Sequence, residues 1–297
     1  MAKQLSGQIC VLPDGRKLGY TAIGKGAPVF YFHGTASSRL EVLLLKELAQ
    51  SVPVQLVGVD RPGYGLSTYR HRSNLTDFND DLTALADHLK FESFAVLGWS
   101  GGGAFALAYT ALNPKRVSRA LIAGTPNLPF DAATAHNMPL ARYIMKIPYA
   151  VNFAMRQLCR QLLKANGDIH AFLATPQGRQ WLHGYTKRDL TFFSNRNWMD
   201  PMYQAMVEAF RQGNDGVKAV VDEHRIFLKP WNLPFAAFEE SKLWVLHGME
   251  DLTCRVANAY AIAKAVPNAQ LEVFKGAGHC VMFENLDRLS KILCTES

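Results

Sequence analysis

The sequence predicts an α/β fold, in which a mostly parallel, eight-stranded sheet is flanked by helices and carries an inserted helical cap. Short apolar stretches alternate with segments of helical periodicity, and most of these stretches are apolar at every position. Strands that are apolar on both faces are typical of a parallel sheet covered by helices on both sides. The alternation stops over residues 126–240 and then resumes, which indicates the insertion.

The first two strands are expected to form a hairpin. Residues 8–12 and 17–23 alternate in polarity, and Pro13, Asp14 and Gly15 supply the turn between them. Apolar runs predict four more strands before the insertion, and apolar residues at helical spacing predict the connecting helices. The expected strands are residues 29–32, 54–59, 94–97 and 119–123, and the expected helices are residues 38–50, 75–89 and 104–112.

The insertion shows helical periodicity, aromatic residues and methionines, without a strand pattern. After it, strands are expected at residues 243–246 and 271–274, and helices at 256–265 and 281–293. We therefore divide the chain into a core of residues 1–125 and 241–297 and a cap of residues 126–240. Open α/β sheets bind ligands at the carboxyl edge of the strands, so we expect the cap to lie over that edge. Its large apolar side chains are expected to form the core of the cap and the roof of a pocket: Phe153, Phe172, Trp181, Phe192, Phe193, Trp198, Met199, Met202 and Met206.

Composition excludes several classes of protein. The net charge of +7 is spread along the 297 residues without a dense basic block, so nucleic-acid binding is not expected. The five cysteines have irregular spacings and no C-x-x-C pair, which indicates neither a disulfide framework nor a zinc site, and no metal or other cofactor is expected. The first ten residues lack the apolar stretch of a signal peptide, and no run approaches the roughly eighteen apolar residues of a membrane span. These features predict a cytoplasmic protein and leave its oligomeric state open.

The sequence G-W-S-G-G at residues 98–102 places Ser100 between a predicted strand and a predicted helix. A strand that turns directly into a helix strains the backbone of its corner residue and pushes the side chain out over the sheet edge. Gly98 and Gly102 remove β-carbons that would collide there. The amide of Gly101, at the start of the helix, points to where an oxyanion would form. The alternative is that Ser100 only caps the helix.

A serine hydroxyl needs a base and an orienting acid to act as a nucleophile. Asp251 follows the strand expected at residues 243–246, and His279 follows the last expected strand. Cys254 and Cys280 lie close to these two residues, but a thiol nucleophile is disfavoured because Ser100 already occupies the strained corner. Three consecutive polar residues at 222–224 cannot converge on one metal ion from a helix, so a solvated face is expected there.

Five stretches of this chain resemble motifs of the α/β-hydrolase fold superfamily, and the likeness covers nearly everything outside the cap. They are F-H-G-T at 32–35, D-R-P-G-Y-G-L-S at 60–67, G-W-S-G-G at 98–102, G-M-E-D at 248–251 and G-H at 278–279. The chain order of serine, acid and histidine also matches.

The resemblance implies roles for particular residues. The backbone N–H groups of Thr35 and Gly101 would form the oxyanion hole. Ser100, Asp251 and His279 would form the catalytic triad, with Asp251 preferred over its neighbour Glu250 because of its spacing from Gly248. His33 and Gly34 would support the oxyanion loop, as Gly98 and Gly102 support the corner. Asp60 and Arg61 are expected to have a structural role, and His247 is expected to be a packed core histidine.

The resulting function is that of a serine hydrolase that cleaves carboxylic esters with an apolar acyl or alcohol group through an acyl-enzyme, without a cofactor. The same triad also serves hydrolysis of C–C bonds, lactones or amides and cofactor-free perhydrolysis, and a non-catalytic small-molecule receptor is a further alternative. Ser100 sets the chain apart from the dehalogenases and epoxide hydrolases of this fold, which have aspartate at the corner. The sequence H-G-T-A-S at 33–37 differs from the H-G-G-P-G of proline iminopeptidases, which disfavours that branch.

Overall fold

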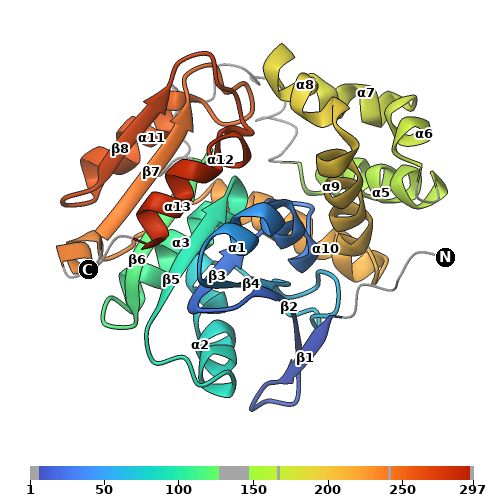
Figure 1. The fold of residues 1–297 in the computed structure, drawn as a ribbon. Helices are drawn as coiled ribbons and strands as arrows, with labels where there is room; N and C mark the ends of the chain where they lie inside the picture. Colours follow the sequence, from blue (N-terminus) through green and yellow to red (C-terminus); the bar gives the residue numbers. More distant parts are fainter. Residues whose placement is uncertain (1–6, 127–146, 166–167, 240–241, 295–297) are drawn as a thin grey trace.

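The computed structural model describes residues 7–126, 147–165, 168–239 and 242–294, and Figure 1 shows their fold. One eight-stranded sheet has the strand order β1-β2-β4-β3-β5-β6-β7-β8. β1 and β2 form the expected hairpin, β2 is also antiparallel to β4, and the remaining pairs are parallel. The strands are β1 (Gln8–Val11), β2 (Lys17–Gly24), β3 (Ala27–Phe32), β4 (Val54–Val59), β5 (Phe94–Trp99), β6 (Val117–Ala123), β7 (Lys242–Gly248) and β8 (Gln270–Phe274).

Helices cover both faces of the sheet, as the apolar strands predict. Successive side chains of a strand point to opposite faces, so Val29 and Tyr31 of β3 join one apolar cluster while Phe30 and Phe32 join the other. Helices α1 and α13 contribute to the first cluster, and α2, α3 and α11 contribute to the second. Their bounds are α1 (Lys46–Ser51), α2 (Asn79–His88), α3 (Gly101–Leu112), α11 (Val256–Ala265) and α13 (Leu286–Cys294).

Three predicted helices are divided in the structure. Residues 75–89 form a 3₁₀ helix, η2 (Leu75–Phe78), followed by α2. Residues 38–50 form a 3₁₀ helix, η1 (Arg39–Leu45), followed by α1, because the buried side chains of Arg39 and Glu41 bond to loops at the sheet edge and hold the segment there. The helix expected at residues 281–293 breaks at Asn285 into α12 (Val281–Glu284) and α13. Apolar spacing alone does not distinguish these short segments from a continuous α-helix.

The described part of the insertion contains helices α5 to α10 and the 3₁₀ helix η3, and no strand. Helix α9 packs against η1 of the core, and Figure 1 shows α5 to α8 beside the core. None of the described helices combines the length and apolar character that crossing a membrane requires. The bounds are α5 (Pro148–Lys164), α6 (Ile169–Leu173), α7 (Pro176–Leu182), α8 (Lys187–Ser194), α9 (Arg196–Ala209), α10 (Asn214–Phe227) and η3 (Phe235–Glu239).

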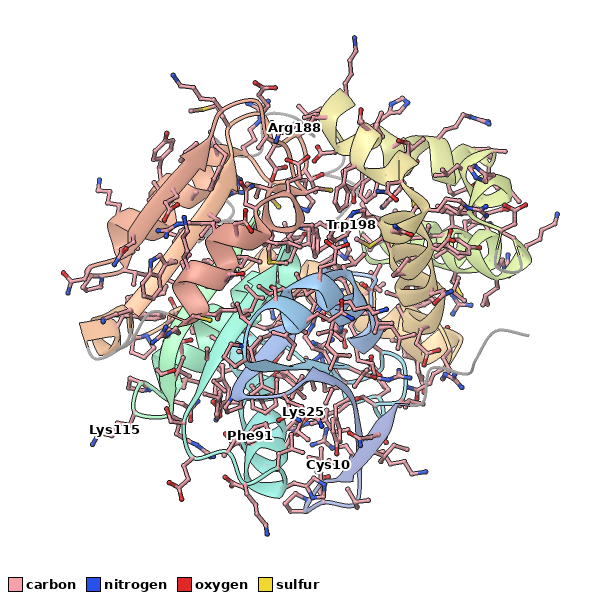
Figure 2. The ribbon with its side chains drawn as sticks, viewed as in Figure 1. Cys10, Lys25, Phe91, Lys115, Arg188 and Trp198 are labelled. Atoms are coloured by element: carbon pink, nitrogen blue, oxygen red, sulfur yellow. The ribbon has the colours of Figure 1, made fainter. Side chains whose placement is uncertain are left out.

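The apolar side chains of the insertion mostly pack as expected. Phe172, Phe193 and the three methionines of α9 are buried, whereas Phe153 is 63% exposed, so its predicted place in the core of the cap is wrong. Trp198 and Arg188, labelled in Figure 2, contact α12 of the sheet-bearing core through Phe283 and Glu284. The division at residues 126 and 240 stays a prediction, because residues 127–146 and 240–241 lie outside the described residues.

Candidate active site

Ser100 lies at the sharp corner between β5 and α3. Its φ of 53° and ψ of −128° are rare for a residue other than glycine, and such backbones cost about 1–3 kcal/mol. The packing explains the glycines. A Cβ on Gly98 would lie 2.7 Å from the Gly102 carbonyl oxygen, one on Gly102 would lie 2.0 Å from a carbonyl oxygen of β3, and one on Gly103 would lie 1.9 Å from Thr125 Oγ1. Backbone atoms therefore exclude a Cβ at Gly98 and Gly102, whereas at Gly103 the atoms in the way belong to the Thr125 side chain.

The Ser100 side chain is not the helix cap of the alternative interpretation, because it makes no capping hydrogen bond to α3. Its hydroxyl instead contacts the buried Cys254 thiol. Burial raises the pKa of Cys254 well above its ordinary value, and the negative charge of Asp251 adds to this effect, whereas the Ser100 contact lowers it. Burial likewise raises the pKa of Cys280. Both thiols stay protonated near neutral pH, which argues against either as the nucleophile.

Asp251 and His279, which follow β7 and β8, meet at the carboxyl edge of the sheet. His279 Nδ1 lies 2.8 Å from Asp251 Oδ2, and Asp251 Oδ1 accepts hydrogen bonds from the N–H groups of Thr253 and Cys254, both at 2.8 Å. With the carboxylate as acceptor, Nδ1 carries the proton and Nε2 is left as a base. Glu250 is exposed, so the buried Asp251 is the acid that pairs with the histidine.

Two residues that sequence reasoning missed bring this pair to the serine corner. The N–H of Ser100 bonds to the carbonyl of Ala123 at 2.9 Å, and the next residue, Gly124, lies directly against the pair. A Cβ on Gly124 would be 3.1 Å from His279 Nδ1. The indole N–H of Trp99 donates to the His279 carbonyl at 2.9 Å, so the residue before the serine also holds the histidine loop.

Ser100 and His279 line the same cavity, whose volume is about 370 Å³. Core residues of the β3 and β5 loops form one wall, and the insertion contributes apolar side chains opposite them. The insertion residues on this cavity include Met155, Leu158, Trp181, Tyr185, Met202 and Met206. The cavity therefore combines the serine, the histidine and a mostly apolar surface, as substrate pockets usually do.

The predicted oxyanion residues lie side by side. A Cβ on Gly101 would be 2.2 Å from Thr35 Oγ1, so the loop after β3 packs directly on the start of α3. His33 is fully buried, and its Nδ1 lies 2.7 Å from the Gly34 carbonyl oxygen. Burial, and the nearby charge of Arg61, lower the pKa of His33 well below its ordinary value, so it is neutral and serves the loop as a hydrogen-bond donor.

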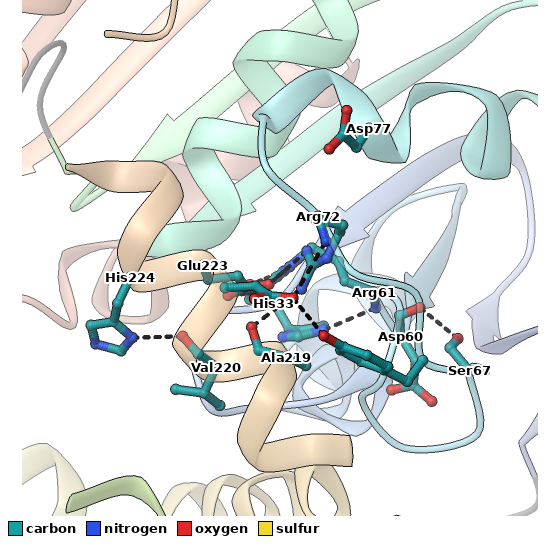
Figure 3. A network of polar contacts seen from close by, with 12 residues as sticks. His33, Asp60, Arg61, Ser67, Arg72, Asp77, Ala219, Val220, Glu223 and His224 are labelled. Carbon is teal, nitrogen blue, oxygen red and sulfur yellow. Dashed lines mark hydrogen bonds and ion pairs between the residues drawn. The ribbon is translucent and has the colours of Figure 1, made fainter. Parts of the chain in front are cut away.

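A buried ionic network lies behind this loop (Figure 3). Arg61 donates to the His33 carbonyl at 2.5 Å and pairs with Glu223 of α10 at 2.6 Å, and Arg72 pairs with the same carboxylate at 3.0 Å. Burial raises the pKa of Glu223, but the two arginines outweigh this effect and hold it at about 2. The expectation of a solvated face at residues 222–224 is therefore wrong, because Asp222 and Glu223 are buried against the core.

Asp60 and Arg61 have structural partners, although they do not pair with each other. Asp60 accepts from the backbone N–H of Arg39 at 2.7 Å and from its guanidinium at 2.8 Å. His247 is buried, and its Nε2 lies 2.7 Å from the Cys254 carbonyl oxygen, as a packed core histidine would.

Asp189 of helix α8, in the insertion, was not singled out from the sequence, yet it holds the histidine loop. Its buried carboxylate accepts the backbone N–H groups of His279 at 3.2 Å and of Cys280 at 2.9 Å. It also accepts from the N–H and hydroxyl of Thr186 in a capping box. Burial disfavours the charged form of His279, but Asp251, followed by Asp189 and Glu41, raises the pKa of the imidazole above its ordinary value.

Comparison with known proteins identifies the family of this chain. A profile described as alpha/beta hydrolase fold matches residues 27–286. A putative proline iminopeptidase of Mycoplasma pneumoniae is 26% identical over 89% of this chain and 92% of its own length. An uncharacterized hydrolase of Bacillus subtilis is 30% identical over 105 residues, which span 35% of this chain and only 37% of that relative.

Solved structures agree in fold. An esterase from Exiguobacterium antarcticum has a TM-score of 0.65 at 19% identity, covering 97% of this chain and 98% of its own. The enol-lactonase from Burkholderia xenovorans has a TM-score of 0.65 at 15% identity, covering 96% of this chain and 97% of its own. At these identities the likeness shows a shared fold and leaves the bond that is cleaved to be argued from the site.

Proposed function

Because the chain belongs to the α/β-hydrolase fold family, we propose that it is a serine hydrolase that cleaves carboxylic esters through an acyl-enzyme intermediate. The observation that carries this proposal is the His279–Asp251 pair, at 2.8 Å, beside a strained serine that opens on the same cavity as the histidine. A serine at a strained corner that opens on a cavity and an imidazole with a free Nε2 are the parts that acyl transfer requires.

In this mechanism Ser100 Oγ attacks the ester carbonyl carbon while His279 Nε2 takes the hydroxyl proton. Asp251 holds the imidazole in the required tautomer and stabilises the imidazolium that forms. The backbone N–H groups of Thr35 and Gly101 donate to the oxyanion of the tetrahedral intermediate. The intermediate collapses, His279 protonates the departing alcohol, and a water activated by the same nitrogen then hydrolyses the acyl-enzyme.

The walls of the cavity support an apolar acyl or alcohol group on the substrate. Methionine and tryptophan side chains of the insertion, Met155, Trp181, Met202 and Met206, face the catalytic residues. Flexible thioethers adapt to ligands of different shape at little cost. The substrate is therefore a small ester with at least one hydrocarbon portion.

Hydrolysis of 4-nitrophenyl esters of increasing acyl length tests the proposal, with Ser100→Ala as the control. A fluorophosphonate that labels the wild type but not the variant identifies the serine directly. Equal rates for the two proteins, or no turnover together with no label, would contradict the proposal. Labelling without ester turnover would retain the nucleophile and move the substrate to another class.

Amide and lactone hydrolysis are the alternatives with named relatives. The 26% identity to a putative proline iminopeptidase makes amides candidate substrates, although this chain has H-G-T-A-S where that branch has H-G-G-P-G. The enol-lactonase shares only the fold. A matched panel of aryl ester, lactone, diketone and aminoacyl amide substrates separates these reactions.

A reducing, cytoplasmic setting fits this enzyme. All five cysteines, which lie among the described residues, are free thiols, and four of them are buried. Disulfides are rare where the surroundings keep thiols reduced. We expect the enzyme to be active in a buffer that contains a thiol reductant and a metal chelator. Loss of activity in that buffer would contradict the proposal that it needs neither a disulfide nor a metal.

A further inference from the structure

Two buried polar atoms line the active-site cavity without partners. Ser37 Oγ and Glu41 Oε2 form no hydrogen bond of standard geometry among the described residues, although the Ser37 hydroxyl lies close enough to the Glu41 carboxyl group to lower its pKa. The Ser37 residue is 3% exposed and Glu41 is fully buried, and both line the cavity that holds Ser100 and His279. Buried polar atoms in folded proteins nearly always have partners, so a pair without them next to a reactive serine calls for an explanation.

Support of the oxyanion loop accounts for only one of the two carboxylate oxygens of Glu41. Glu41 Oε1 accepts from the Tyr31 hydroxyl at 2.7 Å and from the Gly34 N–H at 2.8 Å. Oε2 takes part in neither bond. It lies near the Trp99 ring, because a Cβ on Gly34 would be 3.1 Å from that ring and 3.5 Å from Oε2. Support of the loop therefore does not account for Oε2, and Glu41 lines the cavity together with Trp99 and Ser100.

The electrostatics also place this carboxyl group toward the space between core and insertion. Its negative charge contributes to the raised pKa values of His279 and of Tyr185, two cavity residues whose rings meet edge to face at 6.0 Å between centroids. Burial raises the pKa of Glu41 itself, while Ser37, Tyr31 and Gly34 lower it. The positive charge of Arg61 also lowers it, although among the described residues no lysine or arginine lines the cavity itself.

We propose that Ser37 and Glu41 form an acceptor subsite that binds a hydrogen-bond-donating group of the substrate, a hydroxyl or an ammonium, during hydrolysis at Ser100. An ionised carboxylate only accepts hydrogen bonds, so its partner must donate. The subsite deepens the proposed function, since it rests on a substrate bound at Ser100. A site built around unpaired acceptors rejects an analogue that lacks the donor much more strongly than an apolar pocket rejects one methyl group.

Binding is measured on Ser100→Ala, which retains the subsite and leaves esters intact. The probes are matched ethyl esters that differ in one group: ethyl 3-hydroxybutanoate, ethyl 3-aminobutanoate and ethyl 3-methylbutanoate. The same exchange at carbons two and four covers other distances from the carbonyl. Titration calorimetry is repeated with Ser37→Ala and Glu41→Gln added singly, since glutamine keeps an oxygen for Tyr31 and Gly34. Thermal unfolding confirms that each variant is folded.

At one position a donor ester is expected to bind at least tenfold more tightly than its methyl isostere, and Glu41→Gln is expected to remove most of this preference. A preference for the ammonium alone identifies the charge of Glu41 as the determinant, whereas equal preference identifies hydrogen bonding. Equal or tighter binding of the methyl ester at all three positions overturns the subsite, even where the wild type hydrolyses simple esters. Donor preference without any wild-type turnover supports the subsite and overturns the ester hydrolase.

Discussion

Asp189→Asn tests whether helix α8 of the insertion holds His279, the proposed catalytic base, in place. The carboxylate accepts four hydrogen bonds: two from Thr186 and one each from the N–H groups of His279 and Cys280. Asparagine has the same shape but offers one accepting oxygen and one donating NH₂. At least one buried N–H group then faces a donor, whichever way the amide turns.

A buried donor without an acceptor costs about 1–3 kcal/mol. For a chain of this size that loss lowers the melting temperature by about 2–10 °C. Displacement of the His279 loop is expected to lower kcat/KM by about 10- to 100-fold, because small errors in position slow catalysis strongly. Loss of the Asp189 charge removes one of the interactions that raise the pKa of His279. The base is active only when neutral, so the acid limb of the pH–rate profile moves to lower pH.

Thermal unfolding and pH–rate profiles of ester hydrolysis measure these effects, with two controls. Asp200→Asn removes a half-exposed carboxylate of the same cap, 3.9 Å from Arg196, and is expected to change little. Thr186→Ala breaks the capping box and leaves the carboxylate on the loop, so it costs about 1 kcal/mol without moving the acid limb. If Asp189→Asn has the same stability, rate and pH profile as the wild type, the reasoning is refuted.

Three further substitutions probe the catalytic pair and its support. Asp251→Asn is expected to lower kcat by about three to four orders of magnitude, while Glu250→Gln, which alters its exposed neighbour, leaves kcat unchanged. Gly124→Ala places a Cβ 3.1 Å from the imidazole at a φ of +54° and is expected to reduce both stability and kcat. The control Gly15→Ala, at a φ of +83° with open space around it, is expected to reduce stability alone. A kcat of Gly124→Ala equal to that of Gly15→Ala would refute the packing argument. Glu223→Gln leaves two buried arginines without their carboxylate and is expected to cost about 3–5 kcal/mol at pH 7. Because the pKa of Glu223 is lowered to about 2, its contribution is present above pH 4.5 and is lost as the pH falls toward 2, so denaturant unfolding of the variant must depend less on pH in this window.

Local patterns were sufficient for the fold and for the residues that meet at the sheet edge. The apolar strands and their order predict a parallel sheet, and parallel strands deliver the residues that follow them to one edge. Ser100, Asp251 and His279 each follow a strand, which is why the sequence can predict that they lie at the same edge. The glycines around Ser100 mark a close approach of strand and helix, which the positions of their missing β-carbons explain.

Other features depend on which surfaces meet in three dimensions. Residues 222–224 read as a solvated helix face, but the arginines after β4 cover that face and bury Glu223. Asp189 reads as the third residue of an ordinary capping box, and nothing in that pattern tells that the box docks on the histidine loop. Glu41 lies within a run of leucines whose spacing predicts a helix and not a carboxyl group on the cavity.

The sequence by itself determined the α/β class, the sheet, and the serine, acid and histidine that the strands present at one edge. It could do so because strand period, glycine corners and chain order are local properties. Only the tertiary structure decided which buried charges find partners and which carboxyl oxygen is left facing the cavity. Those outcomes depend on contacts between segments far apart in the chain, where desolvation and pairing energies are set by the packing as a whole.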